Sequence, residues 1–277
     1  MKKMNRFFIA VLSVAAVAVS CQKPEFEETM QLPLVDAEFA AVTEAVPTRM
    51  TLGTSLKPEW ETTDRLAVWD ANALNEFAVS EAEGSVAKFS GKITEGSTEF
   101  HALFPYTDGI KFDNSSKAFT AVIPAEQVIS AGDSVATSAL MGMAYAEKPA
   151  EGTTQFAFQN VCGLIKVVVP TGERITSIVI TSNGDEKFVG EGTVKLTEVT
   201  EGEVTRTVPV FTPTPNAKNS VTLLPEGEGA TFAAGSYYAA VAPVKFESGF
   251  TVYLVRADGA AGVIGTDSVM EVVRNGG

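Results

Sequence analysis

The chain has 277 residues, and 34 acidic side chains outnumber 21 basic ones, which gives a formal net charge of −13. Such a charge repels phosphate backbones and anionic lipid headgroups, which disfavours binding to nucleic acid or to membranes by electrostatics. One histidine and two cysteines are too few for a recognisable zinc or iron site.

The first twenty residues have the pattern of a secretory signal peptide. Basic residues at positions 2, 3 and 6 precede an apolar run, residues 7–20, that ends at Cys21. The run is shorter than the roughly 20 apolar residues that a membrane-spanning helix needs. We therefore expect an exported protein. Loss of the three basic residues with the signal changes its formal charge from −13 to −16.

The end of this signal, Ala18-Val19-Ser20-Cys21, resembles the lipobox of bacterial lipoproteins, in which the cysteine thiol takes a diacylglycerol. Each buried methylene of acyl chains such as palmitate contributes about 0.8 kcal/mol, so lipidated Cys21 would anchor the mature protein. An ordinary cleavage site followed by a chance cysteine is the alternative. Acidic residues close to Cys21 resemble the signal that sends some lipoproteins to the outer face of the outer membrane.

Short β-strands are predicted along most of the remaining chain. Residues 35–42 alternate in a way that places Val35, Ala37, Phe39 and Ala41 on one face. Asn183-Gly184 is a strong hairpin signal, whereas 125–130 and 135–141 carry weak helical signals. Further strands are predicted at 65–69, 100–104, 119–123, 164–169, 175–181, 193–199, 221–224, 237–242, 250–255 and 268–273.

This pattern predicts an all-β protein. Roughly 230 folded residues suit two tandem β-sandwiches of about 100 residues each better than one large barrel. We expect a signal peptide at 1–20, a lipidated tether and N-terminal strand at 21–48, and sandwiches at 49–168 and 169–277.

The sequence offers no catalytic, metal-binding or cofactor-binding set of residues, so an enzyme is not expected. There is no Gly-x-Ser-x-Gly elbow, phosphate-binding loop or dinucleotide fingerprint. His101 is expected to be structural, on the face of its strand opposite Phe100. Cys162 is expected to be a buried thiol, and Asp185 to be solvated charge in a turn.

Aromatic residues leave a second function open. Trp60, Trp69 and either Tyr237 or Tyr238 would stack on sugar rings if they were exposed, as in a surface glycan-binding lipoprotein. For Trp69 core packing is the better expectation. A carbohydrate-active enzyme with an unrecognised carboxylate pair is a third alternative.

Taken in order, the landmarks of the chain resemble the fimbrillin family of lipoprotein pilins, which form type V pili. No single landmark is specific, and the resemblance depends on their order and spacing through most of the chain. The landmarks are Cys21, the strand 35–42, Thr48-Arg49, Trp60, Asp64 to Trp69, Phe104-Pro105-Tyr106, Pro124 with Gln127, Phe158 to Lys166, and Arg274-Asn275.

The resemblance implies two sandwiches of transthyretin-like topology, in a cell-surface subunit or accessory subunit of a fimbrium that contributes to cell adhesion. It further implies that an N-terminal strand carrying Val35, Ala37, Phe39 and Ala41 is removed by cleavage after Arg49. Another pilin subunit then supplies a replacement strand. An ordinary loop arginine is the alternative for Arg49. The other implied partners are the outer membrane, through the lipid, and a ligand on a host or bacterial surface.

Polymerising members of that family carry further strand sequence after the Arg-Asn position, whereas this sequence stops at Gly277. Two expectations follow. Either the sequence is incomplete, or the protein receives a strand without donating one and acts as the anchor of a fibre.

Overall fold

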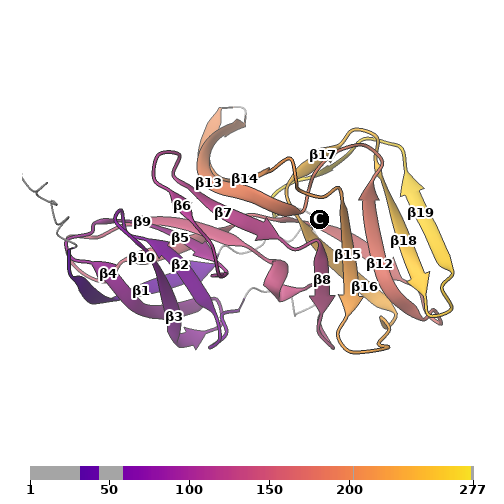
Figure 1. Cartoon of the computed structure of the whole chain (residues 1–277), viewed down its shortest axis with the longest axis horizontal. Helices are drawn as coiled ribbons and strands as arrows, with labels where there is room; N and C mark the ends of the chain where they lie inside the picture. Colours follow the sequence, from indigo (N-terminus) through magenta and orange to yellow (C-terminus); the bar gives the residue numbers. More distant parts are fainter. Residues whose placement is uncertain (1–31, 44–58, 202, 276–277) are drawn as a thin grey trace, which may run out of the picture. The chain divides into compact units, whose positions relative to one another are not determined.

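Short strands dominate the computed structural model, which describes residues 32–43, 59–201 and 203–275 (Figure 1). The described ranges hold twenty strands and one short 3-10 helix, η1 (Thr137–Ala139). The strands are β1 (Leu34–Thr43), β2 (Arg65–Trp69), β3 (Leu74–Glu83), β4 (Val86–Thr94), β5 (Glu99–Phe104), β6 (Phe112–Asp113), β7 (Ala118–Ile123), β8 (Glu126–Ile129), β9 (Gly142–Glu147), β10 (Gln155–Asn160), β11 (Gly163–Val169), β12 (Ile175–Ser182), β13 (Gly190–Glu201), β14 (Val204–Pro213), β15 (Ser220–Pro225), β16 (Gly235–Val241), β17 (Val244–Phe246), β18 (Phe250–Arg256), β19 (Ala261–Thr266) and β20 (Met270–Val272).

Seven of the described strands form a closed sheet in the order β1-β10-β9-β5-β2-β3-β4. Neighbours in this sheet are antiparallel except β1 and β10, which run parallel. Gly84, with φ of +58°, begins the two-residue turn between β3 and β4, where a left-handed conformation suits glycine. Polar and apolar residues alternate along β4, so Phe89 is buried while Lys88 and Lys92 are exposed.

The other described strands form four smaller sheets. Their orders are β11-β16, β19-β18-β12-β15-β8, β14-β13-β7-β6 and β17-β20. Pairings between distant parts of the sequence build these sheets; β7 pairs with β13, β8 with β15 and β11 with β16. Such pairings join strands on either side of the boundary predicted between residues 168 and 169. The division of the chain into two domains at that boundary stays a prediction. By its internal contacts, the chain from Pro33 onward is one compact unit.

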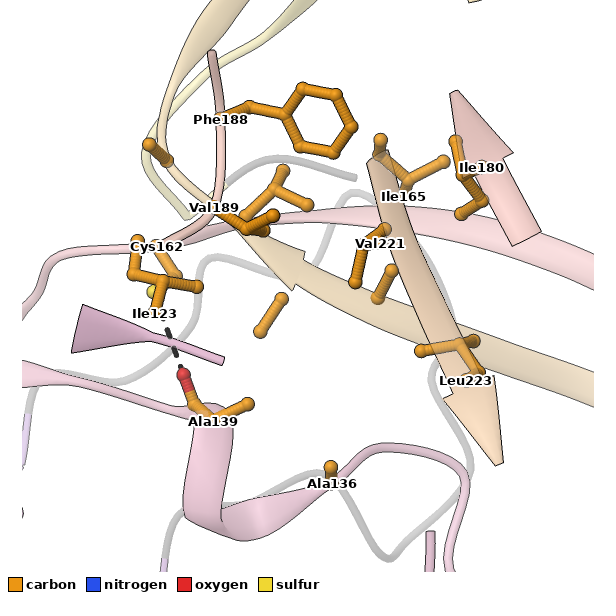
Figure 2. Close-up of a cluster of buried hydrophobic side chains, with 14 of the residues drawn as sticks. Ile123, Ala136, Ala139, Cys162, Ile165, Ile180, Phe188, Val189, Val221 and Leu223 are labelled. Atoms are coloured by element: carbon orange, nitrogen blue, oxygen red, sulfur yellow. Dashed lines mark hydrogen bonds between the residues drawn. The ribbon is translucent and has the colours of Figure 1, made fainter. Parts of the chain in front are cut away.

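Two clusters of buried side chains form the core. The smaller cluster is built on the strands of the closed sheet and is rich in phenylalanine. The larger cluster gathers apolar residues from the other sheets, together with Ala67, Leu103 and Met143 of β2, β5 and β9. Figure 2 shows part of it, where Ile123 and Cys162 lie close to η1 and the thiol of Cys162 donates a hydrogen bond to the carbonyl of Ala139.

The predicted all-β class is confirmed. Every strand predicted from alternation or an apolar run is present, and β1 differs from its predicted range by one residue at each end. The tandem-sandwich arrangement stays a prediction. The closure of a seven-stranded sheet by the pairing of β1 with β4 and β10 was not predicted.

The hairpin predicted at Asn183 is wrong. The segment from Asn183 does not form a hairpin, because β12 pairs with β15 and β18 while the next strand, β13, pairs with β7 and β14. The Asn183 amide instead donates hydrogen bonds to the carbonyls of Ser248 and Thr266. Of the two segments with weak helical signals, 125–130 contains strand β8 and 135–141 contains the 3-10 helix η1.

Candidate functional site

The position of β1 makes it the candidate site. It pairs antiparallel with β4 over nine residues, from Leu34 opposite Thr94 to Val42 opposite Val86. On its other side it pairs in parallel with β10, but only over 40–43. Within the described chain, residues 34–39 therefore have a strand neighbour on one side only. The strand closes the sheet, and it is fully paired only at its C-terminal end (Figure 1).

Phe39 is the one large side chain that β1 places in the smaller core cluster, where its exposed fraction is 2%. Its ring lies near three other rings, with centroid distances of 4.9 Å to Phe77, 4.9 Å to Phe100 and 5.0 Å to Phe156. Burial of a side chain of this size stabilises a fold by about 1.5–3 kcal/mol. Phe39 is therefore the main apolar attachment of β1.

The positions on either side of Phe39 accept only small side chains. Ala41 is fully buried, between Ala87 of β4 and Phe156 of β10. Ala37 is half-buried and lies opposite Gly91 of β4. A Cβ atom added to Gly91 would lie 2.7 Å from the Phe77 ring, so that ring already fills the space beside the backbone.

Opposite charges meet on the outer face of the same two strands. The ammonium of Lys92 lies 3.0 Å from the carboxylate of Asp36. Lys88 has a raised pKa, chiefly through its hydrogen bond with Glu81 and the charge of that residue, and also through the charge of Glu38. Of the two ion pairs, Lys88–Glu81 joins β4 to β3 and only Lys92–Asp36 joins β4 to β1; because it is exposed, it favours a register of β1 more than it adds stability.

The structure places the four predicted strand residues together on β1 and orders them by burial. Phe39 and Ala41 are buried, Ala37 is half-buried, and Val35 is 37% exposed, in the part of β1 that pairs with β4 alone. Cys21 and Arg49, the predicted lipidation and cleavage positions, lie outside the described residues.

His101 and Trp69 pack on the other face of the closed sheet. They are cross-strand partners on β5 and β2, and the ring of each lies 5.1 Å from the ring of Phe112. Burial, with a smaller contribution from the charge of Lys117, lowers the pKa of His101 to about 4. The imidazole is therefore neutral at pH 7, and its face of the strand agrees with the sequence prediction.

Cys162 and the other aromatic candidates are also placed. Burial raises the pKa of the Cys162 thiol to about 12, so this thiol is protonated at neutral pH. Trp60 is buried and its indole nitrogen donates to the carbonyl of Ser85. Tyr238 is buried, while the half-buried Tyr237 donates its hydroxyl proton to the carbonyl of Ala233.

Gln127 has a role that the sequence did not reveal. Its amide nitrogen donates to the carbonyl of Ala240 at 2.6 Å, and its amide oxygen accepts the backbone N–H of Ala240 at 3.0 Å. The same amide nitrogen also contacts the carbonyl of Pro124 at 3.1 Å. One buried side chain therefore joins β8 to the C-terminal end of β16, which accounts structurally for the Pro-x-x-Gln landmark.

The late Arg-Asn pair also makes long-range contacts. The amide nitrogen of Asn160 donates to the side-chain oxygen of Asn275 at 2.7 Å, and the backbone N–H of Asn275 donates to the carbonyl of Cys162. A Cβ atom at Gly163 would lie 2.5 Å from a methyl carbon of Val272. The end of the described chain therefore packs closely on the junction between β10 and β11.

The described ranges contain neither a metal-binding cluster nor a membrane-spanning helix. No group of three or more His, Cys, Asp or Glu side chains is arranged to hold a metal ion. In the same ranges, no helix has the length and apolar character needed to cross a bilayer.

No protein-family profile matches the chain, and no curated protein matches its sequence. Among solved structures it is similar to a protein of Bacteroides ovatus provisionally described as a cell adhesion protein, at 13% identity and a TM-score of 0.46, over 86% of this chain and 89% of that one. A Bacteroides uniformis protein with the same description shows 12% identity and a TM-score of 0.46, over 85% and 98%. The function proposed below therefore depends on the residues of this chain.

Proposed function

We propose that the chain is a surface lipoprotein that acts as a fimbrial subunit, or as an accessory or anchor subunit, and assembles by β-strand exchange. In this proposal it contributes to adhesion and has no catalytic role. The observation that supports the proposal is the placement of β1 at the closure of a sheet, held by buried Phe39 and Ala41, by antiparallel pairing with β4 and by a short parallel pairing with β10.

Removal of β1 would have a defined physical result. It would leave the backbone groups of β4 and β10 unpaired along two facing strand edges. It would also uncover the rings of Phe77, Phe100 and Phe156, which now contact Phe39. A strand from another polypeptide satisfies both requirements at once, because its backbone pairs with the edges and its side chains cover the rings.

The remaining parts of the proposal come from the sequence. Lipid on Cys21 anchors the precursor at the outer membrane, and the chain is exposed at the cell surface. Cleavage after Arg49 releases the segment that contains β1. Other pilin subunits are the partners through strand exchange, a ligand on a host or bacterial surface is the adhesive target, and nucleic acid is not a partner.

The test compares the wild-type chain with Arg49→Lys, which keeps the charge but removes the site for an arginine-specific protease. Material sheared from cells would be examined by N-terminal sequencing and by gel electrophoresis in mild detergent. We expect wild-type chains that begin at Met50 and migrate as ladders. We expect uncut, monomeric chains from Arg49→Lys.

A Cys21→Ala variant tests the anchor separately, because it should leave the outer-membrane fraction. Strand exchange would be rejected if wild-type surface material had only the acylated Cys21 terminus and ran as a single band. That is the result expected for the Arg49→Lys variant.

A further inference from the structure

We infer that the position of β1 selects incoming strands by a side-chain pattern: acidic, small, acidic, Phe, any residue, small. Residues 36–41, with the sequence DAEFAA, are the example that the structure contains. The inference depends on the strand exchange proposed above and specifies the chemistry of the partner strand.

The phenylalanine position follows from the three rings around Phe39. Their centroids lie 4.9 Å to 5.0 Å from the ring of Phe39, and the side chain is buried. A smaller residue would leave a cavity between Phe77, Phe100 and Phe156, which these rings cannot fill without moving. The incoming strand must therefore supply an aromatic ring at this register.

The two small positions follow from the backbones beside them. At Ala41, Ala87 lies on one side and Phe156 on the other, and the alanine is fully buried. At Ala37, the opposite residue is Gly91, which the Phe77 ring covers. A larger side chain at Ala41 would force several buried groups apart, and we expect a milder effect at half-buried Ala37.

The acidic positions set the direction and register of the strand. The carboxylate of Asp36 pairs with Lys92, whereas Glu38 lies opposite Ser90, with Lys88 and Lys92 at the two diagonal positions of β4. A strand running the opposite way would present these charges at the other end of its sequence. Because these charges are exposed, they favour one alignment and contribute modestly to affinity.

Within the printed sequence the full pattern occurs once. Of the 17 phenylalanines, only Phe39, Phe89 and Phe232 have Ala or Gly at both positions two residues away, and only Phe39 also has acidic residues one and three positions before it. Phe89 belongs to β4 itself, and Phe232 is buried in the larger core. In this sequence only residues 36–41 therefore match the pattern, and we expect a partner strand in another subunit to be recognised by the same pattern.

The test uses the full-length chain with a specific protease site placed between residues 48 and 50. After cleavage β1 stays bound without a covalent link, and a fluorescent peptide with the sequence of residues 33–44 is added as competitor. Native mass spectrometry and fluorescence anisotropy measure how much peptide replaces β1.

Variant peptides then test the contribution of each position of the pattern to binding. Phe39→Ala should weaken replacement roughly 100-fold or more, because it leaves a cavity. Ala41→Leu should weaken it roughly tenfold or more through overpacking. The matched control is Ala40→Ser, which changes an outward position and should bind like the parent peptide. The double change Asp36→Lys and Glu38→Lys should weaken binding a few-fold at low salt and less at high salt.

The outcomes separate the two proposals. If the parent peptide replaces β1 and all variants do so equally well, the side-chain pattern is wrong while strand exchange stands. If the parent peptide does not replace β1 in the cleaved protein, strand exchange at this position is rejected, and the pattern is rejected with it.

Discussion

The ring of Phe39 meets the ring of Phe100 edge-on, with centroids 4.9 Å apart and planes at 61°. The contact joins β1 to β5, which is not its neighbour in the closed sheet, where β10 and β9 lie between them on one side. The first described strand is therefore held by contacts across the interior of the sheet as well as by backbone pairing.

Replacement of this ring should be costly. We expect Phe39→Ala to lower the free energy of unfolding by about 3–5 kcal/mol, because the cavity lies among side chains that are already buried. Urea unfolding followed by tryptophan fluorescence is a suitable measurement, since Trp60 belongs to the same cluster. Val35→Ala on the same strand is the control and should stay within about 0.5 kcal/mol, because Val35 is exposed. Equal effects of the two changes would contradict this account of β1.

Gly91 should tolerate no side chain. A Cβ atom there would lie 2.7 Å from the Phe77 ring, so Gly91→Ala is expected to destabilise the fold by about 1–3 kcal/mol through overpacking. Thermal unfolding measures the change as a lower Tm. The matched control is Gly235→Ala in β16, where an added Cβ would meet no atom within 4 Å. A Tm for Gly91→Ala at or above that of Gly235→Ala would show that Phe77 moves aside freely.

The buried amide of Gln127 gives a prediction in another sheet. Gln127→Leu keeps the volume but leaves the N–H and C=O of Ala240 without the partner they have now, which should cost about 2–4 kcal/mol. Urea unfolding measures the loss. Gln159→Leu is the control, because Gln159 makes one exposed bond to the carbonyl of Thr207 and its replacement should have a small effect. A loss below 1 kcal/mol for Gln127→Leu would mean that another group satisfies Ala240.

Alternation along the chain was sufficient to predict β1 and to group Phe39 with Ala41, because both residues face the core of a half-buried strand. It also predicted the face on which His101 lies. Strands such as β3 and β14 were missed, since they carry many polar residues and expose much of their length.

The pairing of strands was not predictable in the same way. Nothing near β1 in the sequence indicates that it lies parallel to β10, more than 100 residues later, because parallel pairing depends on contacts between distant segments. The Asn-Gly signal at 183 failed for a related reason: long-range pairing of β12 with β18 outweighed the local turn preference. The requirement for glycine at position 91 was likewise not predictable, because it depends on the position of the Phe77 ring in the folded protein.

His101 is the only histidine in the sequence, so its titration can be followed without interference. Its Nδ1 atom is buried and has no hydrogen-bond partner among the described residues. The rings of Phe112 and Tyr145 lie against the imidazole, and Lys117 adds a positive charge that opposes protonation. The hydroxyl of Tyr145 donates to the carboxylate of Glu147. Burial and the charge of Lys117 therefore both disfavour the protonated imidazole and lower the pKa of His101.

We predict that the folded protein loses stability as the pH falls from about 6.5 toward 4. The pKa of His101 is about 4 when folded and near 6.5 when unfolded, so between these values the unfolded chain binds more protons. The free energy of unfolding then decreases by at most about 1.4 kcal/mol for each pH unit. Urea unfolding across this range should give a steeper pH dependence for the wild type than for His101→Phe, which does not titrate.

In the folded protein, nuclear magnetic resonance of the imidazole should give a titration midpoint near 4. Lys117→Met should raise this midpoint only in part, because burial is the larger cause of the lowered pKa. A wild-type midpoint near 6.5, with equal pH dependence in both proteins, would contradict the buried, neutral imidazole.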